Sequence, residues 1–336
     1  MGIRRRWPLR YEQGEQLRNL ICAIVYFTGA GWVMSRSRRP GAAILLYHSI
    51  GGRGIFSDNV TPEGVFERQM RFVAQRRKAV SLSTMLDAVL QHREPDPDWV
   101  AVTFDDGYAD FATTALPILE RYGIPASVFV PTVILKGGCL FFDQIEVWVS
   151  AAVGPRIHVR FGTDVLDLSL RTPADRRDAS LRLALCAREL TPTDRAAAMN
   201  AIREACSADS STARMPYLRP EDLARLPASV EIGSHSVSHY ALPKLEDEVL
   251  RTELAESLAA LRAVRAIPAG YLSYPFGKRW AYDRRVAACA AHVGYAAALT
   301  TIPGLVRQGT DPYEIPRMAG AGNMARFRLA LMGLHI

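Results

Sequence analysis

The stretch that decides the fold is WVAVTFDDGYAD, residues 99–110. Its first six residues form an apolar run of the kind found in strands that are buried on both faces of a parallel sheet. Two adjacent carboxylates, Asp105 and Asp106, end that run, and Gly107 leads into a helical pattern. Because close like charges disfavour joint ionisation, the sequence predicts a positively charged partner beside this pair.

Outward from this strand, short apolar runs alternate with helical patterns along the chain. Such alternation indicates βαβ units around a parallel sheet, so the predicted fold class is α/β. The alternation breaks at about 136–220, where 156–171 has the pattern of a hairpin and 173–208 that of helices rich in Ala, Arg and Asp. We interpret 136–220 as an insertion between two strands of the main body. The predicted strands are 44–47, 99–104, 126–130, 230–232, 271–274 and 295–299.

A second strand, in VEIGSHSVSHYAL at 230–242, runs into His235 and His239. Histidines four apart on a helical turn lie on one face and can share a metal ion. Together with Asp106 they make a three-ligand site with one position left for water, which suits catalytic Zn²⁺ or a similar divalent ion. Such an ion lowers the pKa of its water, and Asp105 is placed to take the proton.

Each of these elements alone has a simpler explanation. An H-x-x-x-H pair is more often incidental than metal-binding, Asp-Asp-Gly is common in ordinary turns, and a histidine after a strand is usually a hydrogen-bonded loop residue. The carboxyl ends of parallel strands are where α/β folds collect reactive groups. The joint occurrence of both segments at strand ends therefore favours the metal site.

Together the two segments resemble the polysaccharide deacetylase family, carbohydrate esterase family 4, whose domain is also found in chitooligosaccharide deacetylases. TFDDG at 103–107 matches the first family motif, and HSVSH at 235–239 matches the second, H-[ST]-x-x-H. The resemblance covers roughly 42–320 and is loosest in the insertion. It implies an incomplete (β/α)7-type barrel that removes the acetyl group from an N-acetylated sugar with a divalent metal, Zn²⁺ being the expected ion. By the same resemblance Asp105 is the base. The implied metal ligands are Asp106, His235 and His239.

The third family motif, R-x-P-[FYW], is only partly present, in SYPFG at 273–277. Ser273 stands where the family has an arginine that steadies the base, and Arg317, in the sequence EIPR, is the predicted replacement. We expect the backbone N–H of Tyr274 to stabilise the oxyanion that forms at the attacked amide. The simpler alternatives are a plain Pro-Phe-Gly turn and an Arg317 that pairs with a surface acid.

A general acid must also protonate the departing amine. The family's late L-x-H motif and its D-x-x-D-W motif have no convincing match in this sequence. Residues 44–48, ILLYH, instead resemble a strand ending in L-x-H, and in a barrel the last strand lies beside the first. We therefore predict His48 as the acid; the alternative is a histidine that only lines the pocket. This circularly shifted order resembles family members that act on exported poly-N-acetylglucosamine.

The net charge of +7 is concentrated in residues 1–40, which hold eight arginines and two glutamates. A nucleic-acid binder needs its basic surface on the folded body, so no nucleic-acid partner is expected. The uncharged run 20–34 is shorter than the roughly 20 residues that span a bilayer. We expect 1–40 to bind an anionic membrane surface at the cytoplasmic face. The alternatives are an N-terminal signal segment for export or anchoring and a helix packed on the catalytic body.

The sequence thus predicts two parts: the basic and apolar segment 1–40 and a polysaccharide deacetylase domain over 41–336. The predicted enzyme is a hydrolase acting on an N-acetylated carbohydrate of a cell-surface polysaccharide or its lipid-linked precursor. Alternatives are a sugar O-acetyl esterase, a lipid-linked amino-sugar deformylase and, in a different class, a non-catalytic carbohydrate-binding protein. The five cysteines contain no C-x-x-C pair, which argues against a disulfide framework and a cysteine zinc site.

Overall fold

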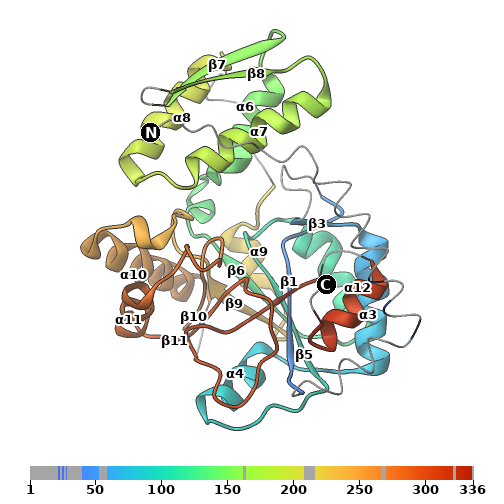
Figure 1. Ribbon diagram of the computed structural model, residues 1–336. Helices are drawn as coiled ribbons and strands as arrows, with labels where there is room; N and C mark the ends of the chain where they lie inside the picture. The colour runs from blue at the N-terminus through green and yellow to red at the C-terminus, as the bar shows by residue number, and fades with distance from the viewer. Residues whose placement is uncertain are drawn as a thin grey trace.

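A curled, all-parallel sheet forms the centre of the computed structural model (Figure 1). The strand order is β11-β10-β9-β6-β5-β1-β12, and β4 pairs with the beginning of β5. This is the predicted incomplete barrel, and every predicted strand is present. The strands are β1 (Ala43–Tyr47), β4 (Lys78–Ala79), β5 (Trp99–Phe104), β6 (Ala126–Val130), β9 (Val230–Ser234), β10 (Gly270–Ser273), β11 (Tyr295–Leu299) and β12 (Met318–Ala319). The structure describes residues 22, 25, 28, 40–52, 59–161, 164–207, 216–265, 270–320 and 323–334.

The stretch that leads into β12 links the two ends of this sheet. Ile315 forms a parallel bridge with Leu299 at the end of β11. Three residues later Met318 pairs with Leu45 of β1. The last strand therefore lies beside the first, as predicted, and Arg317 between these two contacts is carried into the interior.

Helices cover the outside of the sheet because their apolar sides pack against its buried strands. In Figure 1, α10 and α11 lie on one side of the sheet and α3 and α12 on the other, with α4 below. The helices of the main body are α3 (Glu63–Arg76), α4 (Leu82–Leu90), α5 (Leu116–Arg121), α9 (Pro220–Arg225), α10 (Asp247–Val264), α11 (Arg284–Val293) and α12 (Met324–Leu331). A short pair, β2 (Ser49–Ile50) and β3 (Val60–Thr61), follows β1.

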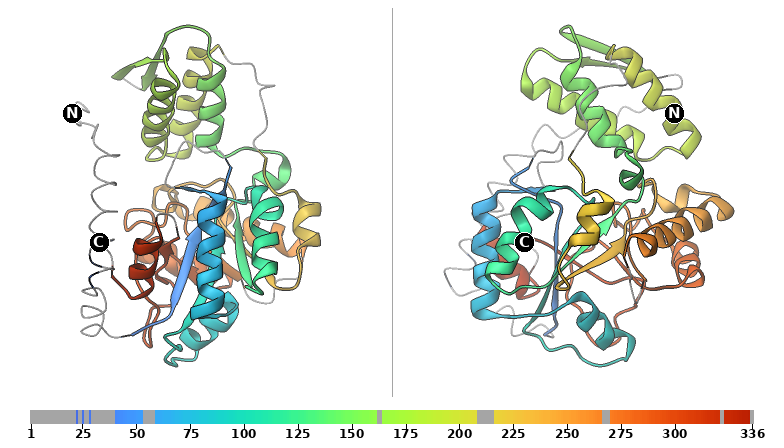
Figure 2. Two further views of the ribbon diagram at one scale, coloured as in Figure 1. Left: turned by 90° about the vertical axis from the view of Figure 1, so that its right-hand side faces the viewer. Right: turned by 180° about the vertical axis from the view of Figure 1, so that it is seen from behind.

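The predicted insertion forms a lobe above the carboxyl ends of the strands (Figures 1 and 2). Its antiparallel hairpin has the predicted position, although the turn residues 162–163 lie outside the described part of the chain. Two capped helices follow, with Thr172 and Thr191 at their N-caps. The elements of the lobe are α6 (Phe141–Ala151), β7 (Arg156–Phe161), β8 (Asp164–Ser169), α7 (Pro173–Ala187) and α8 (Pro192–Ala205).

Most of the segment 1–40, for which we predicted membrane association, lies outside the described residues. Of its described residues, Cys22 and Val25 pack against Leu329 and Leu334 at the C-terminal end of the chain. Within the described part of the chain, no helix has both the length and the apolar composition needed to cross a membrane.

Candidate active site

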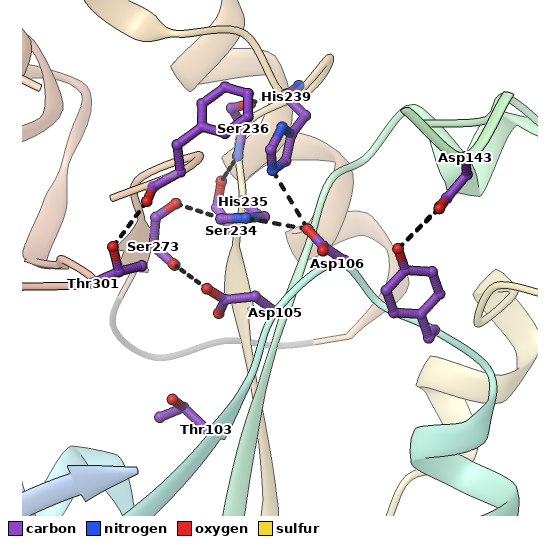
Figure 3. A network of polar contacts seen from close by, with 12 residues as sticks. Thr103, Asp105, Asp106, Asp143, Ser234, His235, Ser236, His239, Ser273 and Thr301 are labelled. Carbon is purple, nitrogen blue, oxygen red and sulfur yellow. Dashed lines mark hydrogen bonds and ion pairs between the residues drawn. The ribbon is translucent and has the colours of Figure 1, made fainter. Parts of the chain in front are cut away.

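Three predicted metal ligands meet at the carboxyl ends of β5 and β9. In Figure 3 the Asp106 carboxylate points at both histidine rings. Its Oδ1 lies 3.4 Å from the Nε2 atom of His235 and 3.4 Å from the Nε2 atom of His239. One ligand atom from each residue falls within 4.8 Å of the other two, and all three side chains are buried.

The donor set fits a cation. The Nδ1 of His235 lies 2.7 Å from the carbonyl oxygen of Ser273, which can only accept, so Nδ1 carries the proton. In the neutral ring Nε2 is then an acceptor and directs its lone pair at Asp106. The Asp106 Oδ1 is buried and has no hydrogen-bond partner among the described residues. Facing acceptors repel unless a proton or a metal ion lies between them, so a divalent metal can take the place of the protons through which these histidines otherwise contact Asp106.

The electrostatic setting keeps Asp106 ionised. Burial alone would raise the pKa of Asp106, but the two histidines beside it hold that pKa well below its ordinary value. A carboxylate and neutral imidazoles are the forms that bind Zn²⁺ and related ions.

The backbone around the site is strained. Most non-glycine residues with a positive φ angle in the described chain lie in the loops that carry the predicted metal ligands or that line the site. Such conformations cost about 1–3 kcal/mol each and persist where the surroundings hold them. The four at the site are Asp106 (+72°), Ser236 (+64°), His239 (+54°) and Phe276 (+63°).

Helix α10 holds the loop of the second motif. The Oε1 of Glu253 accepts hydrogen bonds from the backbone N–H groups of Val237 and Ser238. The Ser257 hydroxyl donates to the carbonyl oxygen of Ser236 over 2.9 Å. The backbone N–H of His239 donates to the Ser236 hydroxyl oxygen over 3.2 Å. Glu253 and Ser257 of α10, together with the Ser236 hydroxyl, therefore hold the turn that carries both histidines.

Beside the three predicted metal ligands, Arg317 binds the carboxylate of Asp105 through two hydrogen bonds. Its Nη1 donates to Oδ1 over 2.8 Å and its Nη2 to Oδ2 over 2.6 Å, and both side chains are 1 % exposed or less. The Nε donates to the carbonyl oxygen of Thr300 over 2.8 Å. The hydroxyl of Ser273 donates to Asp105 over 3.0 Å. Arg317 thus lies where a replacement for the family's missing arginine was predicted, and the small Ser273 side chain leaves room for it.

This pairing sets the charge of Asp105. Burial favours the neutral acid, but the guanidinium of Arg317 and the nearby His235 outweigh burial and lower the pKa of Asp105 below its ordinary value. The positive partner that the adjacent carboxylates required is therefore Arg317. Arg317 binds both oxygens of Asp105, whereas the carboxylate of Asp106 faces the two histidines.

His48 lies at the same end of the sheet, next to Asp105. The backbone N–H of Asp105 donates to the carbonyl oxygen of Tyr47, which places His48 beside the base. Burial lowers the pKa of His48, and the carboxylates of Asp106 and Asp105 oppose that shift without reversing it. The half-buried ring is therefore neutral at pH 7. Its position fits the predicted acid, and its role stays a prediction.

The loop after His48 has a partner that the sequence did not reveal. The Ser49 hydroxyl and the backbone N–H of Ile50 both donate to the Asp110 carboxylate, over 2.5 Å and 3.2 Å. Asp110 follows the first motif by three residues, so it ties this loop to the helix that begins beside the metal cluster.

The prediction for Tyr274 is wrong in this geometry. Its backbone N–H donates to the carbonyl oxygen of Leu299 over 3.0 Å, as part of the pairing between β10 and β11. Its side chain stacks on Tyr282 and donates to the carbonyl oxygen of Tyr313. An N–H already used in the sheet is not free to stabilise an oxyanion, and the ring packs in the core.

Sequence reasoning also missed a buried carboxyl group, Asp143, that the insertion brings to the site. Asp143 of α6 is fully buried and accepts hydrogen bonds from the hydroxyls of Tyr108 and Tyr217. Tyr108 follows Asp106 by two residues, and Figure 3 shows Asp143 on the same side of the site. The signal was a lone carboxylate in the apolar run CLFFDQI at 139–145.

Burial raises the pKa of Asp143 to about 7, with a contribution from the nearby charge of Asp106. Between the ordinary carboxyl pKa of 3.8 and about 7, the folded protein holds a proton that the unfolded chain releases. Stability from this group is therefore full at low pH and falls as pH rises through this range, by at most about 1.4 kcal/mol per pH unit.

Asp143→Asn keeps the shape and removes the titration. In the presence of chelator, raising the pH from 5 to 7.5 should lower the unfolding free energy of the parent relative to that of Asp143→Asn. Urea unfolding of both proteins at the two pH values measures this difference. An identical pH dependence for the two proteins would show that Asp143 is already ionised.

Comparison with known proteins agrees with this geometry. The sequence model of the polysaccharide deacetylase family matches residues 92–138 and 208–298, which contain both motifs. Over these residues the chain is similar to the polysaccharide deacetylase family. The stretch between the two matched ranges contains α6, the hairpin, α7 and α8, so the family model does not cover the lobe.

A curated relative is YxkH of Bacillus subtilis (strain 168), itself named as a polysaccharide deacetylase, which is 31% identical over 106 residues. That alignment covers 30% of this chain and 35% of YxkH, so the chain matches about a third of the relative's length.

Two solved structures share the fold of this chain. The Streptococcus pyogenes deacetylase PplD, solved in complex with acetate, superimposes with a TM-score of 0.58 at 17% identity, covering 88% of this chain and 100% of PplD. IcaB from Ammonifex degensii gives a TM-score of 0.56 at 16% identity, covering 88% of this chain and 98% of IcaB. At these identities the likeness concerns the fold.

Proposed function

We propose that this chain is a metal-dependent hydrolase that removes N-acetyl groups from an amino sugar in a cell-surface polysaccharide or its lipid-linked precursor. One observation carries the proposal: the buried cluster of Asp106, His235 and His239 adjoins a second carboxylate, Asp105, that Arg317 keeps ionised. A protein that only binds sugar has no need of a buried base beside a cation site. The similarity of residues 92–138 and 208–298 to the polysaccharide deacetylase family supports the same reaction class.

The residues divide the work of a hydrolysis in which water adds to the acyl carbon, the C–N bond breaks, and acetate and an amine leave. A bound divalent cation, for which we propose Zn²⁺, would polarise the acyl oxygen and lower the pKa of water. Asp105 accepts the proton of the attacking water. His48 delivers a proton to the departing nitrogen. Because its ring is neutral at rest, we propose that this is the proton that Asp105 took from the attacking water and passed to His48.

The place of the reaction is also part of the proposal. The arginine-rich segment 1–40 would attract an anionic membrane surface, and we propose the cytoplasmic face as the location. A lipid-linked sugar would be presented to the enzyme there. O-acetyl and N-formyl groups have an acyl carbon that water can attack in the same way. The substrate experiment must therefore distinguish N-acetyl, O-acetyl and N-formyl sugars.

The test uses the purified full-length protein, stripped with chelator and reloaded with Zn²⁺. N-acetylglucosamine oligomers, an O-acetylated sugar and an N-formyl amino sugar are supplied in parallel, and acetate and formate are measured. We expect acetate from the N-acetyl oligomers, and a loss of about 10²-fold or more without metal, because Lewis-acid stabilisation is worth several kcal/mol. Release that ignores the chelator would overturn metal dependence. Turnover confined to the O-acetyl or N-formyl sugar would replace the proposed substrate.

A further inference from the structure

A buried arginine of the insertion contacts the main chain of a predicted metal ligand. Arg195 of α8 is 3% exposed and lies between two aromatic rings. Its guanidinium carbon is 4.3 Å from the ring centre of Phe141 and 4.3 Å from that of Tyr240. No carboxylate of the described residues forms an ion pair with it. Aromatic faces stabilise a cation, but a buried charge without an acidic partner still costs free energy.

The guanidinium instead donates to three carbonyl oxygens. Nε reaches Ala187 over 3.1 Å and Nη2 reaches Arg188 over 3.2 Å. Both carbonyls belong to the C-terminal end of α7, where a cation complements the helix dipole. Nη1 reaches the carbonyl oxygen of His239 over 3.3 Å. One side chain thus joins two helices of the insertion to the loop that carries a predicted ligand.

A second arginine of the insertion, Arg176, connects two helices within the lobe and serves as a comparison for Arg195. Arg176 of α7 donates through Nη1 to the carbonyl oxygens of Val149 and Ala152, over 2.6 Å and 3.1 Å, at the C-terminal end of α6. It therefore joins two helices of the lobe in the same way. It is half-buried and its contacts stay within the lobe. Arg195, by contrast, is buried and makes an additional contact to the carbonyl oxygen of His239.

The two histidines differ in how they are held. The ring of His235 is fixed by its hydrogen bond to Ser273, whereas Nδ1 of His239 has no hydrogen-bond partner among the described residues. The ring of His239 contacts Phe142 and Phe276 only edge to face. Its backbone has a φ angle of +54°, a conformation that non-glycine residues rarely adopt. Its main chain, held by Ser236 on one side and Arg195 on the other, must therefore set the direction of the ring.

We propose that Arg195 is a positioning residue for His239: it fixes the main-chain conformation that aims Nε2 at Asp106, so that the insertion sets the cation affinity of the site. The inference rests on the proposed function in taking this cluster to be the metal site. By this proposal the lobe contributes to metal binding, in addition to any contact that it makes with substrate.

The test is the Zn²⁺ dissociation constant of the full-length protein, measured by competition with a chromophoric chelator. Arg195→Met keeps an unbranched side chain between the two rings and removes the donors. Partners of metal ligands are typically worth 10- to 100-fold in affinity, and we expect a loss of about that size. The matched control Arg176→Met should bind Zn²⁺ like the parent. Arg195→Lys, which keeps the charge but lacks the planar fork, should fall between parent and Arg195→Met.

The outcomes separate the alternatives. Parent-like affinity in Arg195→Met overturns the proposal, and so does an equal loss in both methionine variants, which would mean that any loosening of the lobe is enough. If Arg195→Met does not fold, a lysine variant with parent affinity overturns it. His239→Ala marks the affinity expected when the ligand itself is lost. Because this assay needs no substrate, an enzyme inactive on every sugar would end the proposed function and leave the Arg195 result standing.

Discussion

Asp105→Asn is expected to lower acetate release on the order of 10³-fold while the protein keeps its bound zinc. The reason is that the two adjacent carboxylates have separate partners. Asp106 faces both histidine rings, whereas Asp105 is held by Arg317 and Ser273. An asparagine keeps the shape of the side chain and one accepting oxygen, but its amide nitrogen cannot accept a hydrogen bond and neither atom can take a proton from water. Zinc content by atomic emission and turnover on the same preparation measure both halves of the prediction.

The informative control is a second buried Asp→Asn change at the same site. Asp143→Asn also removes a buried carboxyl within reach of Asp106, but Asp143 is engaged by two tyrosine hydroxyls. It should therefore retain most of the activity. Parallel loss of zinc and activity in Asp105→Asn would remove the base assignment, since that pattern belongs to a metal ligand.

The strands and the metal cluster could be predicted because their signals are local. An apolar run such as 99–104 indicates a buried strand by itself, and both motifs follow such runs directly. In a parallel sheet the carboxyl ends of neighbouring strands share one edge. Placing Asp106 near His235 therefore needed only the fold class.

The wrong prediction for Tyr274 has a physical cause. The motif gives the residue type, but the N–H is used by Leu299 because of the register between β10 and β11. Register depends on how two distant segments align, and a single sequence does not contain that information. Arg195 was missed for the same reason: in an Ala- and Arg-rich helix nothing local marks the one arginine whose neighbours are Phe141 and Tyr240.

Arg317→Met is expected to destabilise the metal-free protein by about 3–5 kcal/mol, which is the usual effect of removing one partner of a buried ion pair. The change leaves Asp105 buried, with the Ser273 hydroxyl as its remaining side-chain hydrogen-bond donor and His235 as a nearby group that favours its charge. It also removes the hydrogen bonds to Thr300 and Thr103, which tie the stretch before β12 to β11 and β5. Urea unfolding in chelator, at a pH where the parent is fully folded, gives the magnitude.

The double variant Asp105→Asn with Arg317→Met shows whether the pair or the packing causes this loss. Removing both charges avoids an unpaired ion, so its unfolding free energy should lie above that of Arg317→Met alone, with a coupling of about 0.5–3 kcal/mol. Additive losses would mean that Arg317 contributes only through its contacts with Thr300 and Thr103. The positive partner that the adjacent carboxylates require would then have to be sought elsewhere, and the proposal that Arg317 replaces the family's arginine would fail with it.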